Sequence, residues 1–520
     1  MIDRLRVAAG QFAATQDLDE NLASCLRLID NAIASEVDLL VLPEFSNHIS
    51  VYRDRDHCRA VALSLDGEWL GSIARRARAG GLHVAVTVTT PRDDEVTVTS
   101  VLIDDLGTVI AAVPKQTLMG NERAHLVGGD CVNDLAQTRF GPIGLYACMD
   151  GVTFETPRSY AVRGARLLTN SLNSFALDEA ALHIPVRAVE NGVFVVAANK
   201  VGPLLPVEQV DVFSEALGIP RTALDGAGES QIVGPDGTIL AKASRTGEAV
   251  VWADVDLGAV DHGRLVGRRP ALYAPLGQSR SNVPSGNVPE DVVVAAITST
   301  EQAVDAMADG VQLVVLAEGV APPEAIPDGV YLMSTAVDRG IRTASVWSSR
   351  GVVHKQRQIH SSSATADDAD LAGELSLWDS PFGTVALFVG DDHLFPEAFR
   401  LAAIEGAHIA LVSYEPTNWW ESDLGIRERA AENRLCLVAC SSSEHDVASM
   451  ILNPPLDSLW SPQRSSEYDG TINTPERVRS PDGGPVLGSL HPIRALAREI
   501  SKNTDLVGGR SWRASAPLVS

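Results

Sequence analysis

Hydrophobic and polar positions follow two alternating periods along the first half of the chain. Apolar runs typical of buried strands lie at residues 5–12, 39–42, 82–89, 97–103, 108–113, 141–148, 166–169 and 193–198. Helical spacing of apolar residues lies between them, at 17–35, 66–80, from about 154, and over about 178–191. Pro185 either interrupts the last of these helices or marks its start. Strands that alternate with helices predict an α/β fold.

The second half of the sequence repeats the first. Residues 382–392 match residues 140–150, and the same offset of 242 (382 minus 140) relates 155 to 397 and 187–191 to 429–433. Leu42-Pro43-Glu44 matches Leu316-Ala317-Glu318, and Lys115 matches Lys355. Two copies of one long domain therefore explain the length of 520 residues.

Residues 275–290 contain turn-forming residues and few large apolar groups, so we interpret them as a linker between the copies. The expected organisation is a first domain over residues 1–274, this linker, and a second domain over 291–520. A helix over 178–191 and a hairpin at Pro235-Asp236-Gly237 complete the elements expected in the first domain.

The net charge and the cysteine content indicate which binding partners and which cellular compartment the protein can have. A net charge of -25 argues against nucleic acid and anionic membranes as partners. Six cysteines in so long a chain do not indicate a disulfide framework, and no Cys-x-x-Cys pair suggests zinc. No stretch approaches the length of a membrane span, and the N-terminus has no apolar signal core. A cytoplasmic protein is expected.

Three residues with complementary chemistry follow predicted core strands. Glu44 ends the motif Leu42-Pro43-Glu44, Lys115 follows the strand at 108–113, and Cys148 ends the strand that begins at 141. A carboxylate, an ammonium and a thiol suit acyl transfer through cysteine: the carboxylate takes the thiol proton, and the ammonium stabilises developing negative charge. Taken alone, this stretch favours the interpretation of Cys148 as one more buried small apolar residue over that of a nucleophile.

These motifs resemble the nitrilase superfamily of carbon–nitrogen hydrolases. The resemblance rests on Leu42-Pro43-Glu44-Phe45, on Pro114-Lys115-x-x-Leu118-x-x-x-Glu122, and on Gly144-x-x-x-Cys148-x-Asp150. It covers about residues 5–275 in full and the rest in weaker form. It implies a four-layer α-β-β-α sandwich, present twice, with no metal and no cofactor.

By the same resemblance, Glu44 is the general base, Lys115 the oxyanion stabiliser and Cys148 the nucleophile, and Glu122 helps to position substrate and base. Asp150, Glu155, Glu190 and Asn191 are interpreted as mainly structural, through helix caps and pairing with arginines such as Arg187.

The second copy has Gly390 in place of Cys148 and Ser362 in place of Glu122. Glycine supplies no nucleophile, so we expect a catalytically inactive copy that pairs with the first as an intramolecular pseudo-dimer. Further homo-oligomers remain open.

The residues after Cys148 bear on the substrate. Asp150 resembles the amidase and carbamoylase branches, whereas nitrile-hydrolysing branches tend to have Trp-Glu after the cysteine. A small-molecule amide or N-carbamoyl compound is therefore favoured, with Met149 and Asn173 as candidate contacts. A nitrile hydrolase and an acyltransferase that uses the same thioester remain alternatives, as does a binding or regulatory protein with a silent site.

Overall fold

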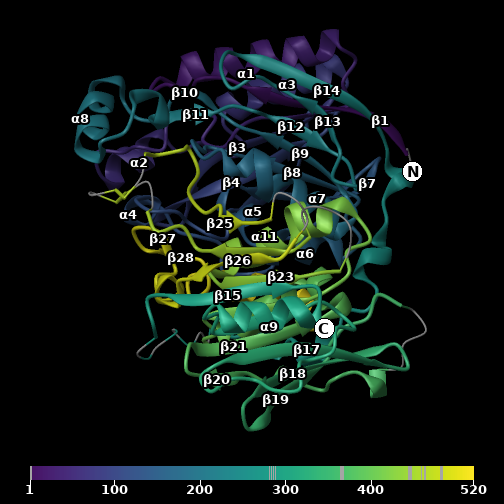
Figure 1. Ribbon diagram of the computed structural model, residues 1–520. Helices are drawn as coiled ribbons and strands as arrows, with labels where there is room; N and C mark the ends of the chain where they lie inside the picture. The colour runs from purple at the N-terminus through teal and green to yellow at the C-terminus, as the bar shows by residue number, and fades with distance from the viewer. Residues whose placement is uncertain are drawn as a thin grey trace.

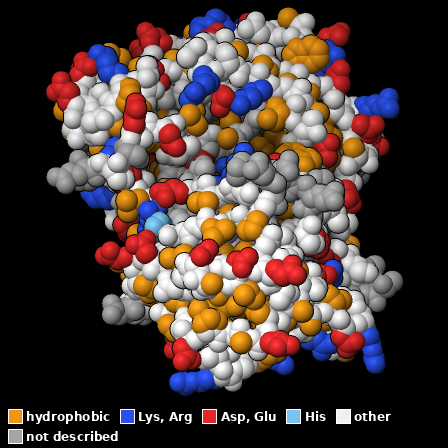
Figure 2. Space-filling model, viewed as in Figure 1, with side chains coloured by type: hydrophobic (Ala, Val, Ile, Leu, Met, Phe, Trp, Pro, Cys, Tyr) orange, Lys and Arg blue, Asp and Glu red, His pale blue; other side chains and the backbone are white. Residues whose placement is uncertain are grey.

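The computed structural model describes residues 3–279, 282, 284, 286, 288–363, 368–442, 448–457, 460–461, 464–465, 467–480 and 484–520. Residues 280, 281, 283, 285 and 287 of the expected linker lie outside this set. Within it, no helix is both long and apolar enough to cross a membrane. On the face shown in Figure 2, acidic side chains are interspersed with basic ones over the upper and lower parts of the molecule.

Two six-stranded sheets build the first half of the chain (Figure 1). Each has three parallel strands at its centre, β1-β2-β3 in one and β7-β8-β9 in the other, and antiparallel strands outside them. The first sheet has the order β14 (Ala249–Asp256), β1 (Arg4–Gln11), β2 (Leu39–Val41), β3 (His83–Arg92), β4 (Glu95–Ile103), β5 (Val109–Pro114). The second has the order β13 (Ile239–Lys242), β12 (Gln231–Val233), β9 (Phe194–Ala198), β8 (Leu167–Ser171), β7 (Gly141–Ala147), β6 (Ala136–Thr138).

Helices cover the outer faces of both sheets. Apolar side chains of α1 (Leu18–Ala34) and α3 (Glu68–Gly80) pack on the first sheet, and a separate apolar core joins the two sheets. The second sheet packs on its other face against α6 (Glu155–Ala161) and α7 (Ile184–Asn191). Because both faces of each sheet are covered, central strands such as β2 are entirely apolar and buried. These are the four layers of an α-β-β-α sandwich.

The second half repeats the same strand order. Its first sheet is β26 (Val486–Leu490), β15 (Val292–Ile297), β16 (Leu313–Leu316), β17 (Tyr331–Asp338), β18 (Ile341–Ser348), β19 (Gly351–Arg357). Its second is β25 (Glu476–Val478), β24 (Met450–Asn453), β23 (Cys436–Cys440), β22 (Ile409–Ser413), β21 (Gly383–Val389), β20 (Trp378–Ser380). Helix α9 (Thr300–Ala308) covers the first sheet, and α10 (Pro396–Ile404) and α11 (Arg427–Asn433) cover the second. The expected α/β sandwich architecture is thus present in two sheet sets.

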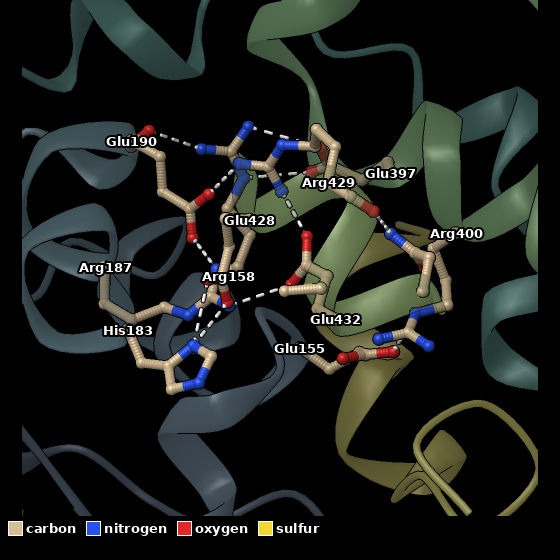
Figure 3. Close-up of polar contacts among 12 residues, drawn as sticks. Glu155, Arg158, His183, Arg187, Glu190, Glu397, Arg400, Glu428, Arg429 and Glu432 are labelled. Atoms are coloured by element: carbon tan, nitrogen blue, oxygen red, sulfur yellow. Dashed lines mark hydrogen bonds and ion pairs between the residues drawn. The ribbon is translucent and has the colours of Figure 1, made fainter. Parts of the chain in front are cut away.

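The halves meet through the helices of their second sheets, near the middle of the molecule in Figure 1. Four buried arginines and their glutamate partners cross this interface (Figure 3). Arg158 pairs with Glu397 at 3.0 Å between Nε and Oε1, and Arg400 pairs with Glu155 at the same distance. Both residues of one pair lie 242 positions from their counterparts in the other. The interface is therefore pseudo-twofold, like the self-complementary contact of a symmetric dimer.

A second reciprocal set lies beside the first. Arg187 bonds Glu190 on its own helix and Glu432 across the interface, and Arg429 bonds Glu432 on its own helix and Glu190 across it. Asn191 donates from its side chain to the Arg187 carbonyl. The interpretation of Glu155, Glu190 and Asn191 as structural residues is confirmed.

The remaining elements are short, apart from one helix. They are α2 (Arg55–Val61), α4 (Glu122–His125), α5 (Met149–Val152), α8 (Val207–Leu217), β10 (Val201–Pro203), β11 (Asp225–Ala227), β27 (Glu499–Ser501) and β28 (Thr504–Asp505). A 3₁₀ segment, Trp512–Leu518, packs against α6 of the first half. The end of the chain thus contacts the first half as well as the second.

One helix that the sequence predicts differs in detail, and one segment was not predicted. The helix over 178–191 begins as a π-helical turn, Glu179–His183, and continues without a break into α7, with Pro185 in its first turn. Proline is tolerated in a first helical turn, where its missing N–H would have no partner within the helix. A π-helical turn also precedes α11, at Glu421–Ile426, although the residue that matches Pro185 there is Arg427, so the turn belongs to the repeated fold and is not caused by the proline. The sequence analysis makes no prediction for the segment from β10 to β11, which contains α8.

Candidate active site

Cys148 lies in a sharp turn between β7 and α5. Its φ is +47°, which residues with side chains seldom adopt. The Cys148 N–H donates to the Ser171 carbonyl and to the Asn170 side-chain oxygen, both at 3.0 Å, and both acceptors lie on the neighbouring strand β8. These bonds hold the strained turn and place the thiol at the carboxyl edge of the parallel strands, where α/β folds commonly bind ligands.

Glu44, Lys115 and Glu122 form one buried ionic group. The Lys115 Nζ lies 2.8 Å from Glu44 Oε1 and donates to both carboxylate oxygens of Glu122 at 2.9 Å. The Met119 N–H fixes Glu122 further, at 3.0 Å. Among the described residues, Glu44 Oε2 has no hydrogen-bond partner, so it can accept a proton. The two carboxylates share one ammonium, which leaves the group with an excess negative charge when all three residues are ionised.

Burial and charge set the protonation of this group. Desolvation raises the pKa of Glu44 to about 7, against the opposing effect of Lys115. Burial opposes the charge of Lys115, but Glu122 and Glu44 outweigh it and hold the Lys115 pKa well above its ordinary value. Burial, with the charge of Glu44, raises the pKa of the Cys148 thiol well above its usual range. Near neutral pH the resting site therefore holds a thiol beside a carboxylate that can take its proton.

A cavity of about 390 Å³ opens on this group. Glu122, Cys148 and Asn173 all line it, as three of the expected site residues. The Asn173 side chain also donates to the Ser50 hydroxyl at 3.1 Å. Met149 does not line the cavity: its side chain is buried in an apolar cluster with Val152 and with Ile500 of the second half. Met149 therefore packs beneath the turn and is not part of the cavity wall.

Asp150 joins two parts of the site. Its buried carboxylate accepts the N–H of Gln116 at 3.1 and 3.0 Å and the N–H of Thr117 at 2.7 Å. These amides follow Lys115 directly, so Asp150 fixes the lysine segment relative to the cysteine turn. The structural interpretation of Asp150 is confirmed.

Lys200 is a buried cation that the sequence analysis overlooked. It follows β9, at the same edge of the sheet as Cys148, and its Nζ has no hydrogen-bond partner in the described part of the chain. The Nζ lies 5.8 Å from the centre of the Phe45 ring, and that of Lys115 lies 5.9 Å from the same ring. Burial lowers the pKa of Lys200 to about 7, against the effect of Glu44. Lys200 could have been found from the sequence, because a charged residue lies two positions after an apolar strand that is parallel to the cysteine strand.

The second half has the same turn without the thiol. Gly390 has a φ of +55°, close to that of Cys148, and Asp392 accepts the N–H groups of Ile359 and His360 as Asp150 accepts those of Gln116 and Thr117. By these contacts the counterpart of Lys115 is Gln358, not Lys355. The match of Lys115 with Lys355 was wrong: Lys355 is an exposed residue on β19. Aligning Lys115 with Lys355 by residue identity placed the two copies out of register by three residues at this point.

The space equivalent to the active site is filled by an arginine. Arg342 Nε donates to Glu318 Oε2 at 2.6 Å, and a Cβ at Gly390 would lie 2.3 Å from Arg342 Cδ. Ser362 bonds the Asp391 carboxylate through its N–H and hydroxyl, each at 2.8 Å. A reactive side chain at position 390 would thus meet an existing ion pair.

The model of the carbon–nitrogen hydrolase family matches residues 6–264, and through this half the chain belongs to that family. The protein is therefore a hydrolase that acts on carbon–nitrogen bonds other than peptide bonds.

Individual relatives match about half of this chain. A nitrilase from Pyrococcus abyssi is 26% identical over 248 residues, which cover 48% of this chain and 87% of the relative. A deaminated glutathione amidase from Bos taurus is 26% identical over 299 residues, 53% of this chain and 85% of the relative. Among solved structures, an amidase from Nesterenkonia sp. is 24% identical, with a TM-score of 0.42 over 50% of this chain and 93% of that one.

Proposed function

We propose that the first half hydrolyses a small-molecule amide or N-carbamoyl compound through a thioester on Cys148. The observation that carries the proposal is the buried group of Glu44, Lys115 and Glu122 beside a cavity that Cys148 lines. The relatives named as deaminated glutathione amidases support an amide substrate. A silent binding site would have no need of a thiol in a strained turn.

The chemistry divides into two half-reactions. Glu44 takes the thiol proton, and the sulfur attacks the amide carbon. The charge that develops on the amide oxygen is stabilised by the Lys115 ammonium and the backbone N–H of Met149. The proton on Glu44 passes to the leaving nitrogen, so that ammonia departs and the acyl group stays on sulfur. Water then gives a proton to Glu44 and attacks the thioester. Glu44 passes that proton to the departing sulfur, so that the carboxylic acid leaves and the free thiol is restored.

Glu122 acts through Lys115. Its two bonds to Nζ keep the lysine charged and fix the position of the ammonium. Asn173 offers a side chain for hydrogen bonding to the amide, since its carbonyl oxygen is buried and has no partner among the described residues. Met149 contributes its backbone, because its side chain is packed elsewhere.

Intact-mass spectrometry tests the mechanism. We expect a panel of primary amides and N-carbamoyl compounds to give a transient acyl adduct on the wild-type chain and none on Cys148→Ala. Release of ammonia and acid into water supports the hydrolase. Release only to an added amine would favour an acyltransferase, and turnover of nitriles alone would favour a nitrile hydrolase. Absence of any adduct and any ammonia would contradict the proposal.

We also propose that residues 291–520 form a catalytically inactive copy of the first domain, and that residues 1–274 form the active one. Gly390 removes the nucleophile, Gln358 replaces the lysine, and the Arg342–Glu318 pair fills the space. The reciprocal ion pairs of the interface support a pseudo-dimer within one chain.

A further inference from the structure

The second half contributes part of the wall of the cavity that contains Cys148. Ser501 and Lys502, in the β27–β28 hairpin, and Trp460 all line it. The Trp460 ring meets Phe175 of the first half edge-on, with 6.2 Å between ring centres. Substrate that reaches Cys148 therefore passes side chains encoded more than 300 residues further along the chain.

Several bonds hold these segments at the cavity. The Gly120 N–H donates to the Thr504 hydroxyl at 2.8 Å, in a buried position. A Cβ at Gly120 would lie 3.1 Å from the Ser501 hydroxyl, so the hairpin packs closely on the loop before Glu122. Nearer Trp460, the Leu177 N–H donates to the Gly470 carbonyl, and the buried Asp178 accepts the N–H groups of Ile472 and Asn473. The hairpin and the segment near Gly470 are thus fixed to the first half.

The cavity wall is mostly apolar, and one cation lies on it. Val51, Phe175, Leu204, Phe213 and Leu224 supply apolar surface from the first half. Glu122, the acidic residue on the wall, is paired with Lys115, which it shares with Glu44. Of the described residues that line the cavity, Lys502 alone carries a positive charge, and its ammonium forms no ion pair within the described part of the chain.

Lysine is rare in this protein. The chain has five lysines, at positions 115, 200, 242, 355 and 502, against 67 acidic residues. An acidic protein of this kind repels anionic ligands in general, so a free ammonium on the wall of an apolar cavity offers an anion a local favourable contact. The cavity volume of about 390 Å³ lies within the range of about 300–1,000 Å³ that is typical of small-molecule sites.

We propose that the second half completes the substrate pocket, and that Lys502 selects amides whose apolar body ends in a carboxylate. This inference rests on the proposed function of Cys148 and adds the substrate class. The amide lies at Cys148, the apolar body lies against Phe175 and Trp460, and the carboxylate lies at Lys502. The inactive copy then determines specificity for the active one.

A matched pair of amides tests the inference on the full chain. 4-(Carbamoylmethyl)benzoate carries the carboxylate, and 4-methylphenylacetamide is its neutral analogue. We measure kcat/KM for both and, independently of turnover, how well each protects Cys148 from iodoacetamide by intact mass. We expect wild type to prefer the carboxylate, and Lys502→Met to lower that preference about fivefold in both measurements, as for an exposed charge pair. Raising the salt concentration should reduce it similarly.

Controls separate the local effect of Lys502 from a general effect of net charge and from misfolding. Lys355→Met removes the same charge from an exposed site on β19 and should leave the preference unchanged. Lys502→Arg should retain it. Trp460→Ala should weaken both compounds equally. Equal protection by the two compounds, no protection by either, or an equal loss in Lys355→Met would overturn the inference. Loss of the Cys148 adduct with every amide would instead contradict the proposed function.

Discussion

Cys148 and Gly390 occupy the same turn with a similar positive φ, and they differ by one side chain. Glycine adopts a positive φ without strain, whereas cysteine adopts it at a cost that the bonds to Ser171 and Asn170 offset. A strained backbone is retained where a side chain has to be presented, which is consistent with a reactive role for Cys148.

The proposed base, Glu44, sets the pH dependence that we expect for the reaction. Burial raises the pKa of Glu44 to about 7, so below that pH the base is already protonated and cannot take the thiol proton. We expect kcat/KM to rise about tenfold per pH unit up to about pH 7 and then level off. Glu44→Gln should lower kcat/KM by about 10² or more at every pH. A flat profile between pH 5 and 7 would be inconsistent with this assignment.

Lys200 should tune that same base. Its positive charge lowers the pKa of Glu44, so Lys200→Met should shift the midpoint of the pH profile to a higher value while leaving the plateau largely intact. Lys242→Met provides the control, because Lys242 pairs with Glu229 on the β13 edge of the molecule. A lower plateau with an unchanged midpoint would mean that Lys200 acts only on packing.

The candidate site was largely predictable from the sequence at this scale. Glu44, Lys115 and Cys148 each follow a strand end, and strand order places such residues at one edge, whereas Glu122 begins the short helix α4 and was inferred from its motif. The place of the Met149 side chain was harder to predict, because the direction of a side chain in a turn depends on tertiary packing. Trp460 and Lys502 were beyond sequence reasoning, since nothing local relates them to a cavity in the other half.

At the scale of elements, helices α6 and α10 carry the reciprocal ion pairs. Arg158 holds Glu397 at full burial, and Arg268 supports the same carboxylate at 2.8 Å. These two cations outweigh desolvation and lower the pKa of Glu397 to about 2. The ion pair therefore contributes to the stability of the whole chain, because each half supplies one of its residues.

Breaking one buried pair should destabilise the whole protein. Arg158→Met leaves Glu397 with one cation instead of two, and we expect a loss of about 3 kcal/mol in unfolding free energy. Denaturant unfolding near neutral pH measures it. A depressed carboxyl pKa stabilises above the unfolded pKa, so the difference from wild type should shrink as the pH falls from about 4.5 toward 2.

The exposed pair between Arg27 and Glu248 offers the matched comparison. Arg27→Met should cost about 0.5 kcal/mol or less, because solvent screens exposed ion pairs. Equal losses in the two variants would show that burial of the α6 pair adds nothing.

At the scale of the whole molecule, each half buries a face that the other supplies. Leu182, Val186 and Val189 of the first half pack on Trp420 and Leu424 of the second. The end of the chain then returns to α6. The repeat was visible in the sequence through its offset of 242, but the return of the last residues was not, because they carry no repeated motif.

Expression of residues 1–275 alone tests this dependence. The fragment would expose an apolar helix face and leave Arg158 and Arg187 without their partners in the second half, so we expect aggregation or strongly reduced activity. Size-exclusion chromatography and the amide assay, with the full chain as reference, are the measurements. A soluble and fully active monomeric fragment would contradict the dependence.

The pseudo-twofold interface has a consequence for the evolution of this protein. In a homodimer every substitution appears in both subunits. An ion pair on one side of the twofold axis is therefore always accompanied by its symmetric copy on the other side. Here each side is encoded separately, and His183 bonds Glu428 at 2.9 Å although their counterparts are Gly425 and Val186. Joining the copies in one chain thus allows one side to specialise while the other compensates, a route closed to identical subunits.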